Sequence, residues 1–218
     1  MKTTENLIGT HKGQKALVIC AGASTRKYQD EIMQFMSDEN PFVIGINNIT
    51  HLFAPEYHLW VNTKRFRNFG KKTWKESKLL LGKGIHIKTI REAIGNRDYT
   101  LINFTDMKPG VPLGYRKGKI LGFFRTGGNL AVMIAHLMGA SDVSIVGMDG
   151  HTFYPYDEVK AGEKPHHCYD EDYSPFDEEL CIKKDEITIG VLRDLSNYGI
   201  KLRILTPTVY KEFYKGFK

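Results

Sequence analysis

The sequence predicts an α/β protein with a mostly parallel sheet that has helices on both faces. Short apolar runs of strand length alternate with segments of helical periodicity from residue 15 onward, and this strand–helix–strand order builds parallel sheets. The runs are apolar throughout, which is typical of strands that are buried on both faces. Because the chain has 218 residues, we expect a single domain over residues 1–218.

The first half of the chain contains four apolar runs that predict strands. They are Lys15–Ala21, Phe42–Asn47, Tyr57–Asn62 and Tyr99–Phe104. The segment Ser24–Ser37 predicts a helix, because its apolar residues recur every three or four positions. Before the last of the four runs, the pattern favours two short strands, Leu79–Leu81 and Ile85–Lys88, and a short helix over Ile90–Ile94.

The second half of the chain begins with residues 106–124, whose prolines and glycines predict a loop. Thr126 can cap a helix that ends before Gly139, and the apolar run Asp142–Met148 predicts the next strand. Three more elements are predicted, a helix over 184–197, a strand over Lys201–Leu205 and a helix over Thr206–Phe217. This order is typical of a Rossmann-like nucleotide-binding domain, in which ligands bind at the carboxyl ends of the strands.

One long segment, residues 149–183, has neither helical nor strand periodicity and is rich in Tyr, His, Pro and acidic residues. A loop of this length in a compact domain is usually functional. We therefore expect a lid or an acceptor-binding insertion, with disorder as the alternative.

The net charge of +6 is unevenly distributed, because residues 1–150 have 21 basic and 12 acidic residues whereas residues 151–218 have 10 and 13. A basic body suggests phosphate-bearing ligands. Nucleic acid is not an expected partner, since no dense Lys/Arg stripe or nucleic-acid motif occurs. No apolar run approaches the ~20 residues of a membrane span. A polar N-terminal segment and three irregularly spaced cysteines favour a cytoplasmic protein.

The turn after the first predicted strand is the first candidate site. Gly22 lets the backbone approach a phosphate, while Ser24 and Thr25 can cap the next helix and donate hydroxyl hydrogen bonds. The turn has neither the full dinucleotide-binding glycine pattern nor a Walker lysine. A tight turn with a helix cap explains these residues equally well.

Asparagines at strand ends are the second candidate. Asn47 and Asn62 end two successive predicted strands, and an amide has both the donor and the acceptor that recognition of a base or a ribose requires. Asparagine is also a common turn residue. Lys64, Arg65 and Arg67 come soon after and could hold phosphates or form a solvated surface.

A third candidate is the start of the clearest predicted helix. Arg125, Thr126, Gly127 and Gly128 could bind an anion there, because a helix N-terminus has unpaired amide groups and a partial positive charge. Ordinary capping and close helix packing are the alternative.

The remaining candidates follow the strand that ends near residue 148. Asp149 could bind a ribose hydroxyl, a base or a metal ion, and His151 lies two residues further on. His166 and His167 lie among acidic residues in the long insertion and are candidates for a general base. Because their spacing matches no closed zinc site, no metal site is predicted.

These motifs resemble those of the bacterial CMP-sialic-acid-dependent sialyltransferases that build lipooligosaccharide. They also resemble the related Rossmann-like group of motility accessory factors and archaeal MptE-like 6-hydroxymethylpterin diphosphokinases. The Gly22–Ser24 turn resembles the end of the family's G-x-G-P-S turn, although Ala21 replaces its nucleotide-contacting asparagine. Asn47 and Asn62 resemble two asparagines that follow the family's second and third strands.

The second half of the chain extends the resemblance. Arg125–Gly128 resembles the family's R-x-T-S-G helix start, one residue shorter, and Val146–His151 resembles its S-G-I-D-F-Y strand end. Asp149 matches the acid of that strand end, but its aromatic pair is missing. Tyr154 and Tyr156 could supply the lost phenols.

The family's catalytic histidine has no direct counterpart in this sequence. A simple alignment puts Cys181 near its position, and His166 or His167 could act there only if the insertion folds differently. The resemblance therefore implies nucleotide binding more directly than sialyl transfer.

The function that the resemblance implies is a sialyltransferase-like glycosyltransferase that uses a nucleotide-activated donor. A CMP-sugar is the favoured donor, a glycan or small molecule is the acceptor, and no tightly bound cofactor is expected. His151, His166 or His167 would deprotonate the acceptor. The alternatives are an MptE-like diphosphokinase with ATP and magnesium, and a non-catalytic nucleotide- or glycan-binding module on a degenerate transferase fold. The relatives often assemble as oligomers, which leaves a homo-oligomer open.

Overall fold

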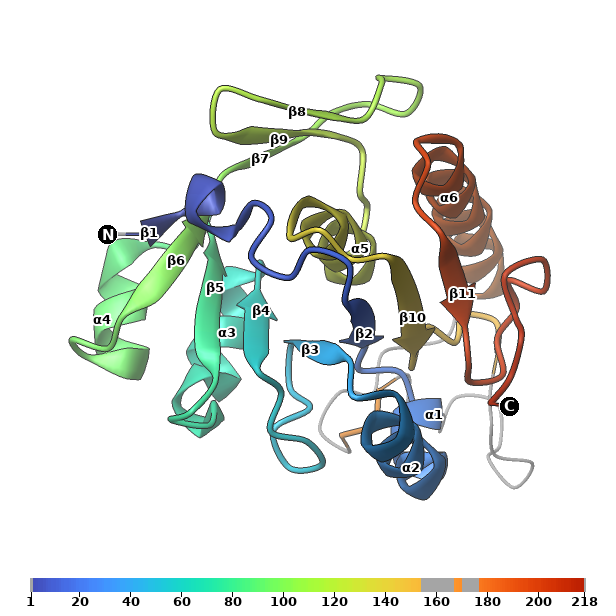
Figure 1. Ribbon diagram of the computed structural model, residues 1–218, viewed down its shortest axis with the longest axis horizontal. Helices are drawn as coiled ribbons and strands as arrows, with labels where there is room; N and C mark the ends of the chain where they lie inside the picture. The colour runs from blue at the N-terminus through green and yellow to red at the C-terminus, as the bar shows by residue number, and fades with distance from the viewer. Residues whose placement is uncertain (1, 154–166, 170–176, 218) are drawn as a thin grey trace.

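The centre of the fold is an eight-stranded sheet in which every strand pair is parallel (Figure 1). This computed structural model describes residues 2–153, 167–169 and 177–217. The strands are β1 (Lys2–Thr3), β2 (Lys15–Ile19), β3 (Phe42–Ile46), β4 (Tyr57–Trp60), β5 (Lys78–Gly82), β6 (Tyr99–Ile102), β10 (Asp142–Val146) and β11 (Leu202–Ile204). Their spatial order is β1-β6-β5-β4-β3-β2-β10-β11. The predicted α/β class with a parallel, Rossmann-like sheet is confirmed.

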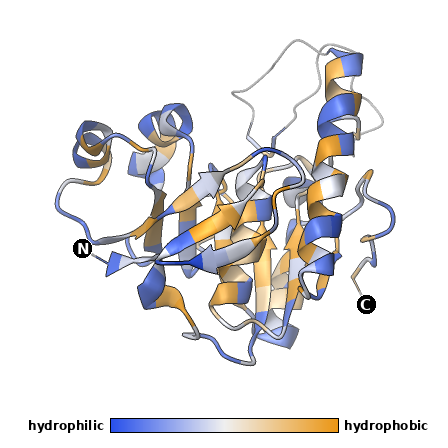
Figure 2. Ribbon diagram, turned by 90° about the horizontal axis from the view of Figure 1, so that it is seen from above, coloured by the Kyte–Doolittle hydropathy of each residue, from blue (hydrophilic) through white to orange (hydrophobic). Residues whose placement is uncertain are grey.

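Helices lie on both faces of this sheet. They are α1 (Ser24–Lys27), α2 (Gln29–Glu39), α3 (Thr63–Phe69), α4 (Ile87–Ile94), α5 (Gly127–Leu137) and α6 (Glu178–Asn197), with short 3-10 helices η1 (Thr4–Leu7) and η2 (Gly70–Lys72). One face buries Ile32, Phe66 and Ile90 from α2, α3 and α4. The other face buries residues of α5 and α6. Figure 2 shows hydrophobic residues concentrated on the strands between these two layers.

Helix α5 is the most deeply buried helix of the described chain. Eight of its eleven residues are buried, and all of these except Asn129 are apolar or glycine. The main sheet packs on one side of it, and a small second sheet contributes Ile120 and the adjacent Phe124 to the same core (Figure 1). This burial fixes the N-terminus of α5 relative to the strand ends.

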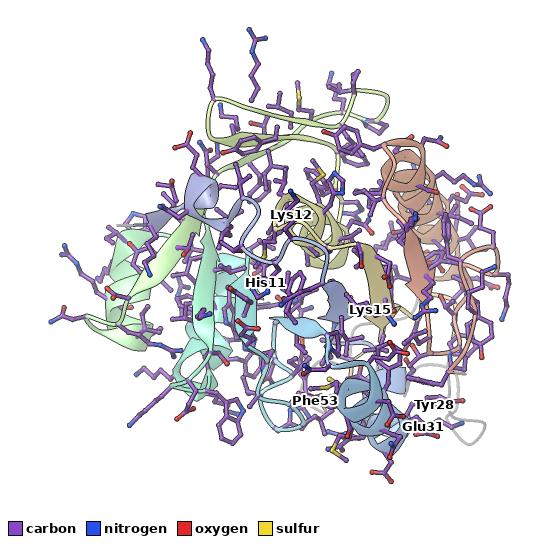
Figure 3. All side chains as sticks on the ribbon, in the orientation of Figure 1. His11, Lys12, Lys15, Tyr28, Glu31 and Phe53 are labelled. Atoms are coloured by element: carbon purple, nitrogen blue, oxygen red, sulfur yellow. The ribbon has the colours of Figure 1, made fainter. Side chains whose placement is uncertain are left out.

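The predicted helix over Ser24–Ser37 is interrupted. Tyr28 has φ −111° and ψ 33°, outside the helical range, so α1 ends there and α2 begins at Gln29. Figure 3 shows Tyr28 at this break. The single turn of α1 therefore belongs to the loop after β2, whereas α2 packs against the sheet. The predicted short strand over Ile85–Lys88 is also wrong, because α4 begins at Ile87.

The predicted loop over residues 106–124 is instead part of a three-stranded sheet. Its strands, in the spatial order β7-β9-β8, are β7 (Phe104–Asp106), β9 (Lys119–Gly122) and β8 (Gly114–Arg116). Lys117 and Gly118 both have positive φ, 49° and 73°, which is the backbone geometry of a two-residue hairpin turn. Gly118, one of the glycines on which the loop prediction rested, therefore lies in the turn between β8 and β9.

The predicted closing helix over Thr206–Phe217 is also wrong. The Thr208 hydroxyl donates to the Met148 carbonyl at 2.7 Å, and the Val209 amide donates to the Asp149 carbonyl at 2.9 Å. The Thr206 hydroxyl accepts from the Gly147 amide at 2.9 Å. The segment 206–210, which we name the C-terminal brace, is held by these hydrogen bonds to the loop after β10.

Helix α6 begins at Glu178, six residues before the predicted start at residue 184. Asp177 is its N-cap, and its carboxylate accepts from the Leu180 amide at 3.0 Å. The predicted insertion over residues 149–183 thus ends in a helix, and most of its remainder lies outside the described residues. Within the described ranges, no helix has the length and apolar character needed to cross a membrane.

Two glycines give a matched test of the packing at the end of α5. Gly139 has φ +96°, and a Cβ there would lie 2.8 Å from the Lys12 Cα atom. We expect Gly139→Ala to lower the free energy of unfolding by roughly 1–3 kcal/mol. Gly190 lies within α6 with nothing near its missing Cβ, so Gly190→Ala should raise it by about 0.4–1 kcal/mol. Urea unfolding measures both, and equal effects would contradict this account.

Candidate functional site

A cavity of about 310 Å³ lies at the carboxyl ends of the central strands. The chain leaves β2 towards β3 on one side and leaves β10 towards β11 on the other. Adjacent strands with diverging connections create a crevice, and this is where ligands bind in open α/β sheets. Figure 1 shows β2 and β10 side by side with α1 near their ends. The described lining residues come from the loops after β2, β3 and β10, from α3, the start of α5, the first half of α6 and the C-terminal brace, together with His167.

The turn after β2 approaches the loop after β10 closely. The Gly22 amide donates to the Gly147 carbonyl at 3.0 Å. A Cβ on Gly22 would lie 2.3 Å from that carbonyl oxygen and 2.8 Å from the Asp149 side chain, so only glycine fits. The cavity wall at this turn is formed by Cys20, Ala21 and Gly22. Burial raises the pKa of the Cys20 thiol, which therefore stays protonated.

Ser24 and Thr25 are fully buried and do not line the cavity. The Ser24 amide donates to one Asp149 carboxylate oxygen at 2.8 Å, and the Ser24 hydroxyl donates to the other. The Thr25 hydroxyl donates to the Cys20 carbonyl at 2.7 Å. Both hydroxyls, predicted to bind a phosphate, thus have partners within the protein.

Asp149 is only 5% exposed and joins the two loops at the base of the cavity. Burial raises the pKa of its carboxyl to about 6, while the hydrogen bonds from Ser24 and Ala23 act in the opposite direction. Its oxygens already accept from Ser24. Asp149 was predicted to contact a ligand. Its hydrogen bonds give it a structural role, because they hold the turn at Gly22 in place.

The N-terminus of α5 borders the same cavity. Thr126 is the N-cap, and its hydroxyl accepts from the Asn129 amide at 3.2 Å. Gly127 and Gly128, the first two helical residues, line the cavity. A Cβ on Gly128 would lie 2.7 Å from the Met148 side chain. Arg125 has φ +60°, is exposed and is not among the lining residues.

The two predicted asparagines have different places. Asn47 lines the cavity with φ +56°, and its carbonyl accepts from the His58 Nε2 at 2.6 Å. Asn62 is exposed and does not line the cavity. It is the N-cap of α3, where its side chain accepts from the Arg65 amide at 3.0 Å. Asn62 thus acts on the cavity through the helix that bears Arg65.

His58 is fully buried, and this burial lowers the pKa of its imidazole to about 4. The ring is stacked on Trp60 at a centroid distance of 5.0 Å. A neutral imidazole has one N–H, and the carbonyl of Asn47 requires it at Nε2. His58 therefore holds Asn47 in its left-handed backbone conformation.

His167 and Arg65 form a pair at the cavity wall. The His167 Nδ1 lies 3.3 Å from the Ala21 carbonyl oxygen, and its Nε2 lies 3.0 Å from an Arg65 guanidinium nitrogen. A carbonyl accepts and a guanidinium donates, so the proton belongs on Nδ1. The Nε2 lone pair then accepts from Arg65. This arrangement suits a residue that orients Arg65 better than one that takes a proton from a substrate.

The remaining wall combines His151 with α6 and the C-terminal brace. His151 lines the cavity together with Asp177, Cys181, Lys184 and Tyr210. Burial raises the pKa of the Cys181 thiol and that of the Tyr210 phenol, so both side chains are neutral. The described chain contains two predicted proton acceptors, His151 and His167. Both ring nitrogens of His167 contact Arg65 or Ala21, which makes His151 the better placed of the two to accept a proton in the cavity.

Tyr154, Tyr156 and His166 lie outside the described residues. Among the residues that the structure does describe, no group of three or more His, Cys, Asp or Glu side chains could hold a metal ion.

Sequence reasoning missed Asp185, which lies on α6 and contacts the loop that carries His151. Its signal was a polar residue on a buried helix face. Cys181, Asp185, Thr188 and Leu192 recur at three- and four-residue spacing, and all are buried. A carboxylate at such a position needs hydrogen-bond donors, and this requirement could have singled it out.

Comparison of the sequence with protein-family models and with characterised proteins gives no match.

The buried His58 predicts a pH dependence of stability. The unfolded chain binds a proton near pH 6.5, whereas the folded protein excludes it until about pH 4. Stability should therefore fall as the pH falls through this window, by on the order of 3 kcal/mol. His58→Gln keeps an N–H donor but does not titrate. The difference in unfolding free energy between the two proteins should shrink as the pH falls from 6.5 to 4, and a constant difference would contradict the assignment.

Proposed function

We propose that the protein is a transferase that uses a nucleotide-activated donor, with a CMP-sugar as the favoured donor and a glycan as the acceptor. One observation carries this proposal. A single cavity at the diverging point of a parallel sheet combines the N-terminus of α5, the Arg65 guanidinium and the His151 side chain. The first two suit the phosphate of a nucleotide, and the third suits removal of a proton.

Phosphate binding follows from the electrostatics of two elements. The first residues of α5, Gly127 and Gly128, lie where the helix carries a partial positive charge. Arg65 provides a fixed charge from α3, and His167 orients it. In the proposed complex these groups stabilise the negative charge that develops on the leaving phosphate.

The nucleoside would lie along the turns after β2 and β3. Gly22 lines the cavity at the first turn, and Asn47 lines it at the second with an amide side chain. An amide can both donate to and accept from a base or a ribose. Asp149 supports this surface by holding the Gly22 turn through Ser24.

The proposed reaction needs one proton acceptor. An acceptor hydroxyl forms a bond to the anomeric carbon of the donor sugar, and the bond from that carbon to the phosphate oxygen breaks. The nucleotide leaves with the electron pair, and His151 takes the hydroxyl proton. Arg65 and the α5 N-terminus balance the charge on the leaving group.

The magnesium-dependent diphosphokinase is the weaker candidate. Such an enzyme holds magnesium through carboxylates. Both oxygens of Asp149 already accept hydrogen bonds from Ser24, and Asp177 caps α6 with its carboxylate. These contacts favour a reaction in which the Arg65 guanidinium and the backbone amides of α5, and no magnesium ion, bind the donor phosphate.

Thermal-shift measurements with CMP, a CMP-sugar and ATP, each with and without magnesium, test the proposal. A ligand that binds only the folded state raises the midpoint by mass action. We expect a metal-independent shift with CMP and the CMP-sugar. A shift with ATP that requires magnesium would favour the diphosphokinase. Binding without transfer to any of a panel of glycan acceptors would favour the non-catalytic module.

Two arginines on α3 provide a matched pair of variants. Arg65 lines the cavity, whereas Arg67 is exposed and lies away from it. Loss of a charged hydrogen bond costs about 1.5–3 kcal/mol, so Arg65→Gln should weaken CMP binding by about tenfold or more. Arg67→Gln should bind CMP like the wild type in calorimetric titration. Equal affinities for all three proteins would remove Arg65 from the phosphate site.

His151 separates binding from chemistry. We expect His151→Gln to retain CMP affinity within about twofold and to lose at least 100-fold in transfer rate, because general-base catalysis is worth roughly 10²–10⁴-fold. Transfer assays and titrations on the same preparation measure the two effects. Wild-type turnover in this variant would exclude His151 as the base.

A further inference from the structure

A buried carboxylate on α6 is bonded to two separate parts of the chain, the loop after β10 and the C-terminal brace. Asp185 is 8% exposed. One of its oxygens accepts from the His151 amide at 2.7 Å and from the Tyr210 hydroxyl at 2.9 Å. The other accepts from the Thr152 amide at 2.9 Å and from the Thr152 hydroxyl at 2.7 Å. Four donors thus converge on one side chain.

The residue before His151 is shaped for this contact. Gly150 has φ +97°, and a Cβ there would lie 2.3 Å from the Val209 side chain and 3.3 Å from an Asp185 oxygen. Only glycine allows the chain to turn this closely against α6 and the C-terminal brace. The backbone at residues 150–152 is therefore held from both sides.

Docking of α6 does not require the carboxylate. Val191, Leu192 and Leu195 already bury the following turns of the helix in the core. Burial of a carboxylate is costly unless its oxygens are hydrogen-bonded, and apolar residues would pack the helix as well. The burial of Asp185 is explained by its hydrogen bonds to the backbone of His151 and Thr152.

We propose that Asp185 is a positioning residue that fixes His151 in the cavity, with Tyr210 as its partner. This inference rests on the proposed function, in which His151 takes the acceptor proton. Two hydrogen bonds to successive backbone amides set the direction in which the His151 side chain leaves the main chain. Tyr210 shares one of the Asp185 oxygens and also lines the cavity. Because burial raises the pKa of its phenol, Tyr210 remains a donor.

The test is Asp185→Asn in the full-length protein. An amide has one acceptor oxygen, so at least one of the two pairs of donors loses its partner. Small displacements of reacting groups cost on the order of 100-fold in rate. We expect kcat for glycosyl transfer to fall about 10- to 100-fold, with the donor KM and the CMP dissociation constant within twofold of the wild type. Tyr210→Phe removes one of the four bonds and should give a smaller fall in kcat.

A spectroscopic readout makes the test independent of turnover. The His151 imidazole resonance, assigned by its absence in His151→Gln, should shift when CMP is added to the wild type. In Asp185→Asn this response should change or disappear although CMP still binds. Asp194→Asn is the matched control, because Asp194 is on the same helix and exposed. It should behave like the wild type in every measurement.

The outcomes separate the two proposals. If Asp185→Asn keeps both the wild-type kcat and the wild-type response of His151, the positioning role is wrong. If CMP affinity falls as much as kcat, Asp185 supports the fold of the whole site and the positioning role is also wrong. If the wild type binds CMP and transfers no sugar, the proposed function fails, and the His151 resonance alone then decides whether Asp185 fixes that residue.

Discussion

The arrangement at the cavity depends on one buried hydrogen-bonded pair, Asp149 and Ser24. Asp149 follows β10 and Ser24 opens α1 after β2, so their two hydrogen bonds join loops that are 125 residues apart in sequence. The pair closes the base of the crevice where the two strands diverge. Gly22 and Gly147 make this contact possible, because a side chain at either position would overlap the other loop. A buried carboxylate needs such donors to offset its desolvation.

Several residues that line this cavity are held in place by polar side chains that lie outside it. His58 holds the carbonyl of Asn47, Asn62 caps the helix that bears Arg65, and Asp185 holds the backbone of His151. In each case a polar group outside the cavity fixes a residue that lines it. Pre-organised groups cost little reorganisation when a ligand binds or reacts, and rigid support of this kind suits the charged, flexible donor that we propose.

Local sequence patterns identified most strands of the main sheet, but they did not identify β1, the small second sheet or most of the polar roles. A fully apolar strand such as β2 is evident from its composition, because only a doubly covered sheet buries such a run. The hairpin of β8 and β9 was missed, since its glycines resemble those of a loop until the positive φ values of Lys117 and Gly118 are known. The C-terminal brace was predicted as a helix because its threonines and Pro207 are compatible with a first helical turn.

The sequence alone determined the parallel α/β sheet, the edge at which polar residues gather and the helix that Thr126 caps. Periodicity and capping are local properties, so neighbouring residues suffice to specify them. Only the tertiary structure decided what each polar residue does. It joined Ser24 to Asp149 and brought Asp185 to His151. These partners are 125 and 34 residues apart in sequence, and a hydrogen bond between distant segments leaves no pattern in a single chain.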